Sequence, residues 1–293
     1  MKQKRKQQRR KRNSGFVPIL LAVCAVLLVV FLIGKLGGRS DLANEIADGK
    51  AYLESLEEKK PEAVQQVRKE IRKAELEAEL DQLLVQIDNG EVDPFSLFED
   101  YALMGDSRSV GFEYWEFLDP NRVFAYAGDT ILKIEEQMDQ VVALNPSTVI
   151  LCYGLNDISI GIWKTPEEYI TDYMAAIEQL RTNLPETTIV VSSILPARDP
   201  AFNRASAWRN IPDWNVELEK ACQENNVLYA NCNEIAEAHA DLWDIDGIHF
   251  QATFYPYWGR CLIETILSAQ IDADAPEATN DAAEPTDDTT EES

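Results

Sequence analysis

Between residues 91 and 268 the chain alternates short apolar runs with longer amphipathic stretches, and this alternation restricts the fold more than any other feature. The apolar runs are continuous, which is typical of strands covered on both faces of a parallel sheet. Strands that alternate with helices predict an α/β fold, a right-handed three-layer α/β/α sandwich around a five-stranded parallel sheet. The five strands are expected at residues 101–104, 122–127, 148–153, 187–194 and 227–231.

The clearest helix start in this region is Thr165-Pro166-Glu167-Glu168. Threonine can cap the first turn, proline suits the first helical position, and a glutamate two positions later can bond back toward the cap. Apolar residues at helical spacing follow, so one face of this helix is predicted to be buried. That face consists of Ile170, Met174, Ile177 and Leu180.

Charge is divided very unevenly along the chain. The first 40 residues hold ten Lys/Arg and no acid, so all 51 Asp/Glu share the remainder with 17 basic residues. Such an acidic body repels nucleic acid, which we therefore exclude as a partner. Residues 16–34 carry no charge and as a helix would span about 28 Å, close to the hydrocarbon thickness of a bilayer. Because eight basic residues precede this span, the positive-inside rule predicts a cytoplasmic N-terminus and an extracytoplasmic remainder.

These patterns predict five parts. Residues 1–14 form a basic cytoplasmic tail, 15–36 a single transmembrane helix, 37–91 a helical stalk, 92–268 the α/β domain, and 269–293 a disordered acidic tail. A cleaved signal peptide is the alternative to the anchor, but signal peptides have shorter apolar cores and an A-x-A-like site, which does not follow here.

The stalk is helical in pattern and broken at Pro61. Its two apolar stripes are out of phase, so a long coiled coil is not supported. We expect a solvent-exposed helical stalk. The alternative is that the stalk mediates homo-oligomerisation.

The five cysteines show no C-x-x-C or His/Cys spacing, so no metal site is expected. Cys24 falls in the predicted membrane span and Cys152 in a predicted strand. Cys222, Cys232 and Cys261 are either buried free thiols or include one disulfide, which an extracytoplasmic location would permit.

Ser107 follows the first predicted strand directly, at the carboxyl edge of the sheet where ligands bind in this architecture. A nucleophilic serine needs a base, a group that orients the base, and donors for the oxyanion. The chain has two histidines. His239 lies in a helical stretch with polar neighbours, as a surface histidine would. His249 follows the last strand, three residues after Asp246, a spacing that lets the carboxylate reach the imidazole; Asp244 competes but lacks that spacing.

Oxyanion donors are expected at two other strand ends. Gly128 ends "VFAYAGDT", and no side chain shields its N–H. Asn156 lies in "VILCYGLND", and its amide can donate to an oxyanion. Each fragment alone could be a simple turn, but four such fragments at successive strand or sheet ends favour a site.

These four fragments resemble the four sequence blocks of the SGNH, or GDSL-type, hydrolase family. "GDSRS" supplies Ser107, "AGDT" supplies Gly128, "GLND" supplies Asn156, and "DGIH" supplies Asp246 and His249, in the family's order over residues 101–266. The resemblance implies a flavodoxin-like SGNH hydrolase fold. It also implies a Ser107–His249–Asp246 triad and an oxyanion hole made of the Ser107 and Gly128 N–H groups and the Asn156 amide.

One position departs from the commonest form of the first block, which has Leu after the serine where this chain has Arg108. Arg108 could meet an anionic group of a substrate or pair with a local acid. Four tryptophans could likewise stack on sugars, although core packing is their usual role. They are Trp115, Trp163, Trp208 and Trp214.

The resemblance and the predicted anchor together lead us to expect a membrane-anchored, extracytoplasmic serine esterase that needs no cofactor. Family members include esterases, lipases, thioesterases, carbohydrate deacetylases and some acetyltransferases. An O-acetyl group of a cell-envelope glycan is the expected ester. The alternatives are an O-acyltransferase with a glycan acceptor and a non-catalytic surface scaffold.

Overall fold

The computed structural model describes residues 49–50 and 61–274 of the 293-residue chain. The predicted cytoplasmic tail, the predicted transmembrane helix and the end of the acidic tail lie outside these residues. None of the helices within the described ranges has the length and apolar character needed to cross a membrane. Leu80–Gln270 form one compact unit, which contains the whole sheet, and the first part of the stalk helix belongs to the other.

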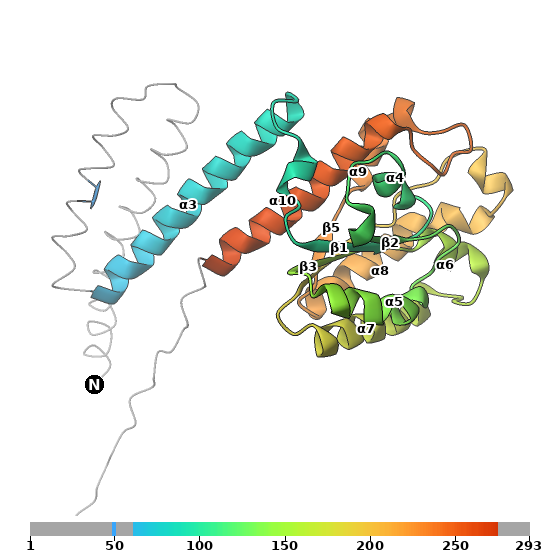
Figure 1. The fold of residues 1–293 in the computed structure, drawn as a ribbon, viewed down its shortest axis with the longest axis horizontal. Coiled ribbons are helices and arrows are strands. Elements are labelled where there is room, and N and C mark those ends of the chain that lie inside the picture. Colours follow the sequence, from blue (N-terminus) through green and yellow to red (C-terminus); the bar gives the residue numbers. More distant parts are fainter. Residues whose placement is uncertain (1–48, 51–60, 275–293) are drawn as a thin grey trace, which may run out of the picture. The chain divides into compact units, whose positions relative to one another are not determined.

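The sheet has five parallel strands in the order β2-β1-β3-β4-β5, which confirms the predicted architecture (Figure 1). Every strand falls within its predicted segment except β1, which is one residue longer at its end. The second and fourth predicted segments extend two residues past the observed strands, although the N–H groups of Tyr126 and Ser193 still donate to the Gly105 and Ala230 carbonyls of the neighbouring strands. The strands are β1 (Tyr101–Gly105), β2 (Val123–Ala125), β3 (Thr148–Cys152), β4 (Thr188–Ser192) and β5 (Leu228–Ala230).

Two hydrophobic clusters, one on each face of the sheet, make the three layers. Met104 of β1 packs in the cluster with α5 (Lys133–Leu144), α7 (Pro166–Asn183) and α8 (Ile211–Glu224). Its neighbour Leu103 packs in the other, with the helices on the opposite face, because successive side chains of a strand point to opposite faces. Figure 1 shows the two helical layers on either side of the sheet. The second layer consists of α4 (Val110–Tyr114), α9 (Asn233–Ala238) and α10 (Tyr255–Asp274).

Helix α7 begins as its sequence predicts. Thr165 is the N-cap and its hydroxyl accepts the Glu168 N–H, while the Glu168 carboxylate accepts the N–H of Lys164, one residue before the cap. Its buried face is shifted from the predicted one: Tyr169 and Tyr173 are fully buried, whereas the predicted Ile170 and Met174 are only half-buried. Ile177 and Leu180 are buried as predicted, so the two tyrosines replace only the first half of the predicted face.

Within the described part of the stalk, the long helix α3 (Pro61–Asp88) begins at the proline where the pattern predicts a break. Helix α10 runs to Asp274, past residue 268 where the domain was predicted to end. Ile271 in this added stretch is buried, so the first residues of the predicted acidic tail are ordered helix. Their apolar residue explains the difference, since a purely acidic segment would have nothing to bury.

A disulfide joins Cys232, at the start of α9, to Cys261 of α10, with their Cα atoms 5.9 Å apart. This resolves the open choice among three cysteines, and Cys222 stays free and buried like Cys152. The bridge spans 29 residues and encloses both Asp246 and His249.

Loop-closure entropy for a bridge of this span predicts that the disulfide stabilises the fold by about 3–4 kcal/mol. We expect reductant to lower the midpoint of urea unfolding of the parent protein, measured by tryptophan fluorescence. A Cys232→Ala/Cys261→Ala double variant should match the reduced parent and be insensitive to reductant. Equal midpoints for the oxidised and the fully reduced parent would contradict this expectation.

Candidate active site

Ser107 lies in the tight turn that joins β1 to α4, at the carboxyl edge of the sheet. The Asp106 carboxylate accepts the Arg108 N–H at 3.0 Å, and the Asp106 carbonyl accepts the Ser109 N–H at 3.0 Å. A side chain at Gly105 would collide with Ser109 and with the main chain of β3, so only glycine fits where the turn begins. The turn is thereby fixed on both sides of Ser107, which is itself half-buried.

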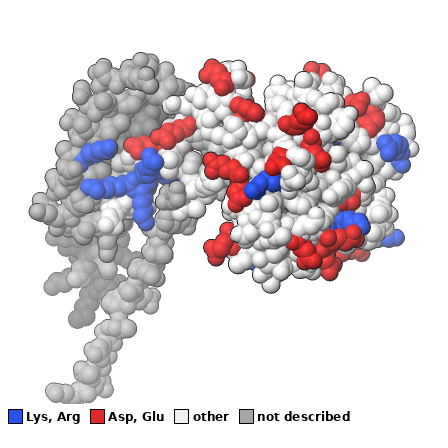
Figure 2. All heavy atoms as spheres, viewed as in Figure 1, with Lys and Arg blue, Asp and Glu red and all other residues white. Residues whose placement is uncertain are grey.

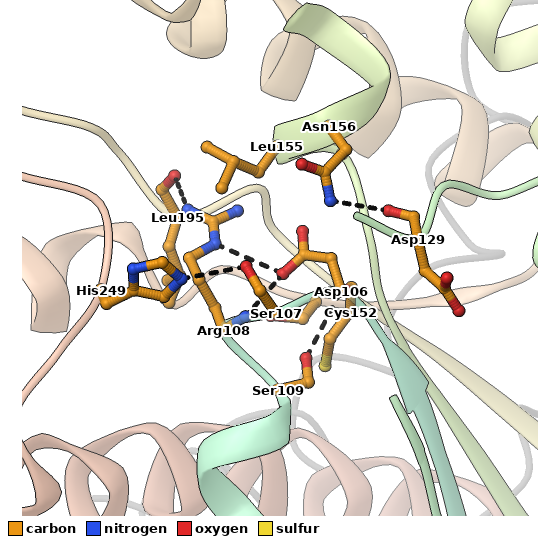
Figure 3. A network of polar contacts seen from close by, with 12 residues as sticks. Asp106, Ser107, Arg108, Ser109, Asp129, Cys152, Leu155, Asn156, Leu195 and His249 are labelled. Atoms are coloured by element: carbon orange, nitrogen blue, oxygen red, sulfur yellow. Dashed lines mark hydrogen bonds and ion pairs between the residues drawn. The ribbon is translucent and has the colours of Figure 1, made fainter. Parts of the chain in front are cut away.

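A chain of hydrogen bonds leads from Ser107 to the loop between α9 and α10. Ser107 Oγ lies 3.0 Å from His249 Nε2, as Figure 3 shows, and His249 Nδ1 lies 2.7 Å from Asp246 Oδ2. The other Asp246 oxygen accepts the N–H groups of Ile248 and His249, each at 2.9 Å. The three predicted triad residues are therefore placed in hydrogen-bond contact, in the order that proton transfer from a serine requires.

The environment of Asp246 favours its charged form. Burial raises the pKa of this carboxyl group, but hydrogen bonds from the backbone and ring of His249 and from Ile248 outweigh burial and hold the pKa below its ordinary value. Asp244 is exposed, and its carboxylate accepts the N–H of Ile245 instead. The spacing argument therefore selected the carboxylate that faces the imidazole.

The predicted oxyanion donors come from the loops after β2 and β3. Gly128 is exposed and has a positive φ of 90°. Within the described part of the chain, neither its N–H nor that of Ser107 donates to an acceptor. The Asn156 amide donates one hydrogen to the Asp129 carbonyl at 2.8 Å (Figure 3), which leaves its second hydrogen for another acceptor.

Asp157 is a site residue to which the sequence analysis gave no role, although it ends the quoted "GLND" block. Its carboxylate accepts the Ile131 N–H at 2.9 Å and the Gly154 N–H at 3.0 Å, so it joins the Gly128 loop to the Asn156 loop. Burial raises the pKa of Asp157 to about 7, against the opposing effect of these hydrogen bonds. Its position directly after Asn156 was the one sequence signal that could have indicated its role.

Arg108 is 3% exposed, which fits pairing within the protein rather than an open contact with substrate. Its Nη1 donates to the Leu195 carbonyl at 2.6 Å, and its Nε lies 3.7 Å from Asp106 Oδ1. Of the two interpretations of this residue, pairing with a local acid is the one that the contacts favour.

Other candidate residues lie away from the site. His239, expected at the surface, ends α9, where it is half-buried and stacks on Tyr257 with ring centroids 3.7 Å apart. Among the described residues, no three His, Cys, Asp or Glu side chains gather as a metal site would require. Three of the four tryptophans belong to the core and only Trp115 is substantially exposed; the buried ones are Trp163, Trp208 and Trp214.

Solved structures with a similar fold include several esterases. A GDSL-like lipase from Bacteroides thetaiotaomicron is 18% identical, with 58% of this chain and 88% of that chain covered and a TM-score of 0.49. A carbohydrate esterase family 3 protein from Talaromyces cellulolyticus is 18% identical (59% and 97% covered, TM-score 0.44). The acetylxylan esterase Axe2 from Geobacillus stearothermophilus is 15% identical (57% and 94% covered, TM-score 0.42).

No curated protein sequence matches the chain. The sequence model of the GDSL-like Lipase/Acylhydrolase family does match, over residues 108–255. That span covers half of the chain and includes Gly128, Asn156, Asp246 and His249. Ser107 directly precedes it. The chain therefore belongs to the GDSL-like lipase/acylhydrolase family.

Proposed function

We propose that this protein is a serine esterase that cleaves its substrate through an acyl-enzyme. The observation that carries the proposal is the continuous chain of contacts from Ser107 Oγ through His249 to the Asp246 carboxylate. An isolated serine hydroxyl is a weak nucleophile, and an adjacent imidazole that is oriented by a carboxylate activates it.

In this mechanism His249 Nε2 takes the Ser107 proton while Oγ attacks the ester carbonyl. The oxyanion that forms accepts hydrogen bonds from the N–H groups of Ser107 and Gly128 and from the Asn156 amide. His249 then gives its proton to the leaving alcohol, and Asp246 stabilises the imidazolium in between. Water, activated by His249, releases the acyl group in the second half of the reaction.

We further propose that the enzyme acts outside the cytoplasm, anchored through residues 15–36, on O-acetyl groups of a cell-envelope glycan. The basic segment before an uncharged apolar span supports the topology. The Cys232–Cys261 bridge supports the compartment, since disulfides persist where the environment is oxidising. Acidic side chains are scattered over the α/β domain on the face drawn in Figure 2, which favours a neutral glycan over a polyanionic one.

Ser107→Ala should abolish hydrolysis of p-nitrophenyl acetate and covalent labelling by a fluorophosphonate, because no other hydroxyl faces the His249 imidazole within the described residues. Ser109→Ala is the matched control. Its hydroxyl is buried and directed at the Cys152 carbonyl, 3.4 Å away, so labelling and turnover should persist. Labelling of the Ser107→Ala protein at the parent rate would place the nucleophile elsewhere.

Asp246→Asn should lower kcat by about 10⁴-fold with the fold retained, because an amide at this position favours the wrong imidazole tautomer. Asp244→Asn should have a small effect, since that carboxylate is exposed and faces the Ile245 N–H. Steady-state kinetics on p-nitrophenyl acetate measure both variants. The reverse ranking would show that Asp244 is the orienting carboxylate.

The proposed topology predicts that protease added to intact cells removes the part of the chain after residue 91. A tag at the N-terminus should survive, because it would lie in the cytoplasm, and it should be lost after permeabilisation. A secreted form without residues 1–36 as the main product would rule out the uncleaved anchor.

A further inference from the structure

Arg108 follows the nucleophile directly and yet is almost completely buried. Arginine is rarely buried unless it is paired, and this guanidinium has two partners within the protein. Nη1 donates to the Leu195 carbonyl at 2.6 Å, a short charge-assisted hydrogen bond, and Nε lies 3.7 Å from Asp106 Oδ1. The guanidinium thus points at the Leu195 carbonyl in another segment. Its positive charge lies near the Asp106 carboxylate of its own turn.

The main chain of Arg108 is held as firmly as its side chain. Its N–H donates to Asp106 Oδ1 at 3.0 Å, and its carbonyl accepts the Tyr255 hydroxyl at 2.8 Å. Ser107 is one peptide bond away. Any displacement of Arg108 therefore changes the direction in which Ser107 Oγ points.

The segment that accepts the Arg108 hydrogen bond is itself hydrogen-bonded to the loop that contains Asp246 and His249. Leu195 lies in the segment after β4, and three residues on, the Arg198 N–H donates to the Gly247 carbonyl at 2.9 Å. Gly247 lies between Asp246 and His249 and has a φ of 72°. A Cβ at Gly247 would collide with the Arg198 carbonyl group, so the two segments are in close contact there.

We propose that Arg108 is a positioning residue that holds the nucleophile turn in register with the loop of Asp246 and His249. The connection passes from its guanidinium to Leu195, along the segment after β4, and from Arg198 to Gly247. It fixes the distance between two catalytic groups that are 142 residues apart in the sequence. The inference rests on the proposed serine mechanism and adds to it a residue that makes no contact with substrate.

Loss of this connection should affect the chemical step more than binding. A misplacement of about 1 Å between reacting groups can cost on the order of 100-fold in rate. Arg108→Leu should therefore lower kcat on p-nitrophenyl acetate about 10- to 100-fold and leave KM within about threefold. Arg108→Lys keeps a charge and a donor and should recover part of kcat.

Arg122, directly before β2, provides a control that contacts the amino end of β1, opposite the nucleophile turn. Its Nη1 donates to Asp100 Oδ1 at 2.9 Å and to the Tyr101 carbonyl at 2.8 Å, so it also joins one carboxylate and one main-chain oxygen. Arg122→Leu should reduce Tm, as Arg108→Leu should, but leave kcat unchanged because it lies far from the carboxyl edge of the sheet.

The experiment compares the full-length parent, Arg108→Leu, Arg108→Lys and Arg122→Leu. Concentrations of active enzyme come from fluorophosphonate titration, kcat and KM from p-nitrophenyl acetate, and Tm from thermal unfolding. A loss of kcat in Arg108→Leu at constant KM, partly restored in Arg108→Lys and absent in Arg122→Leu, supports the proposal.

Two results would overturn it: a kcat within about threefold of the parent in Arg108→Leu, or a raised KM at unchanged kcat, which would make Arg108 a substrate contact. If Arg108→Leu does not fold, the same two readouts on Arg108→Gln, which removes the charge and keeps a polar side chain, decide. A parent that neither labels nor turns over would instead refute the proposed esterase function, on which this inference depends.

Discussion

The hydrogen bond between Ser107 and His249 joins residues that are 142 positions apart, and the rest of the fold serves to keep its 3.0 Å length. A parallel sheet is suited to this task because every strand ends at the same edge. The turn after β1 provides the nucleophile, and the loop between α9 and α10 provides the base and its carboxylate. The loops after β2 and β3 face the same edge with Gly128 and Asn156. No single segment could supply these groups, so the site exists only when the sheet is complete.

Buried polar contacts join these loops to one another, beyond the contacts that join them to the sheet. Asp157 accepts N–H groups from both oxyanion loops, and Asn156 donates to the carbonyl of Asp129. The Cys232–Cys261 bridge encloses the segment of Asp246 and His249. A loop that is held at its ends only by strands has freedom to move, whereas catalysis requires donors and nucleophile at fixed separations. These cross-connections supply that rigidity.

The sequence predicted the five-stranded parallel sheet, because a continuous apolar run marks a strand that is buried on both faces. Such a run is a local pattern, so it can be read without knowing which distant segments make contact. The sequence also predicted which residues meet at the site: Ser107, Gly128 and Asn156 lie in the turns that follow β1, β2 and β3, and Asp246 has the right spacing to His249. What it missed depends on contacts between distant segments. Tyr169 and Tyr173 fill the core although their hydroxyl groups suggest exposure, and the partner of Cys232 is set by how α10 packs. The sequence left two interpretations of Arg108 open, because its nearest acceptor is a carbonyl of Leu195 and no sequence pattern marks a main-chain acceptor.

Holding the oxyanion loops with a buried carboxylate has a cost in stability. Burial, the largest influence, raises the pKa of Asp157 from 3.8 to about 7, and the nearby Asp106 carboxylate acts in the same direction. The native state therefore binds a proton more readily at this site than the unfolded chain does. It follows that the contribution of Asp157 to stability falls as the pH rises from about 4 to 7, the reverse of the usual behaviour of a carboxyl group. A neutral amide would avoid this cost, but its NH₂ group would face an N–H donor of Ile131 or Gly154. The need to accept two backbone N–H groups at once accounts for an acid at a position where its charge is unfavourable.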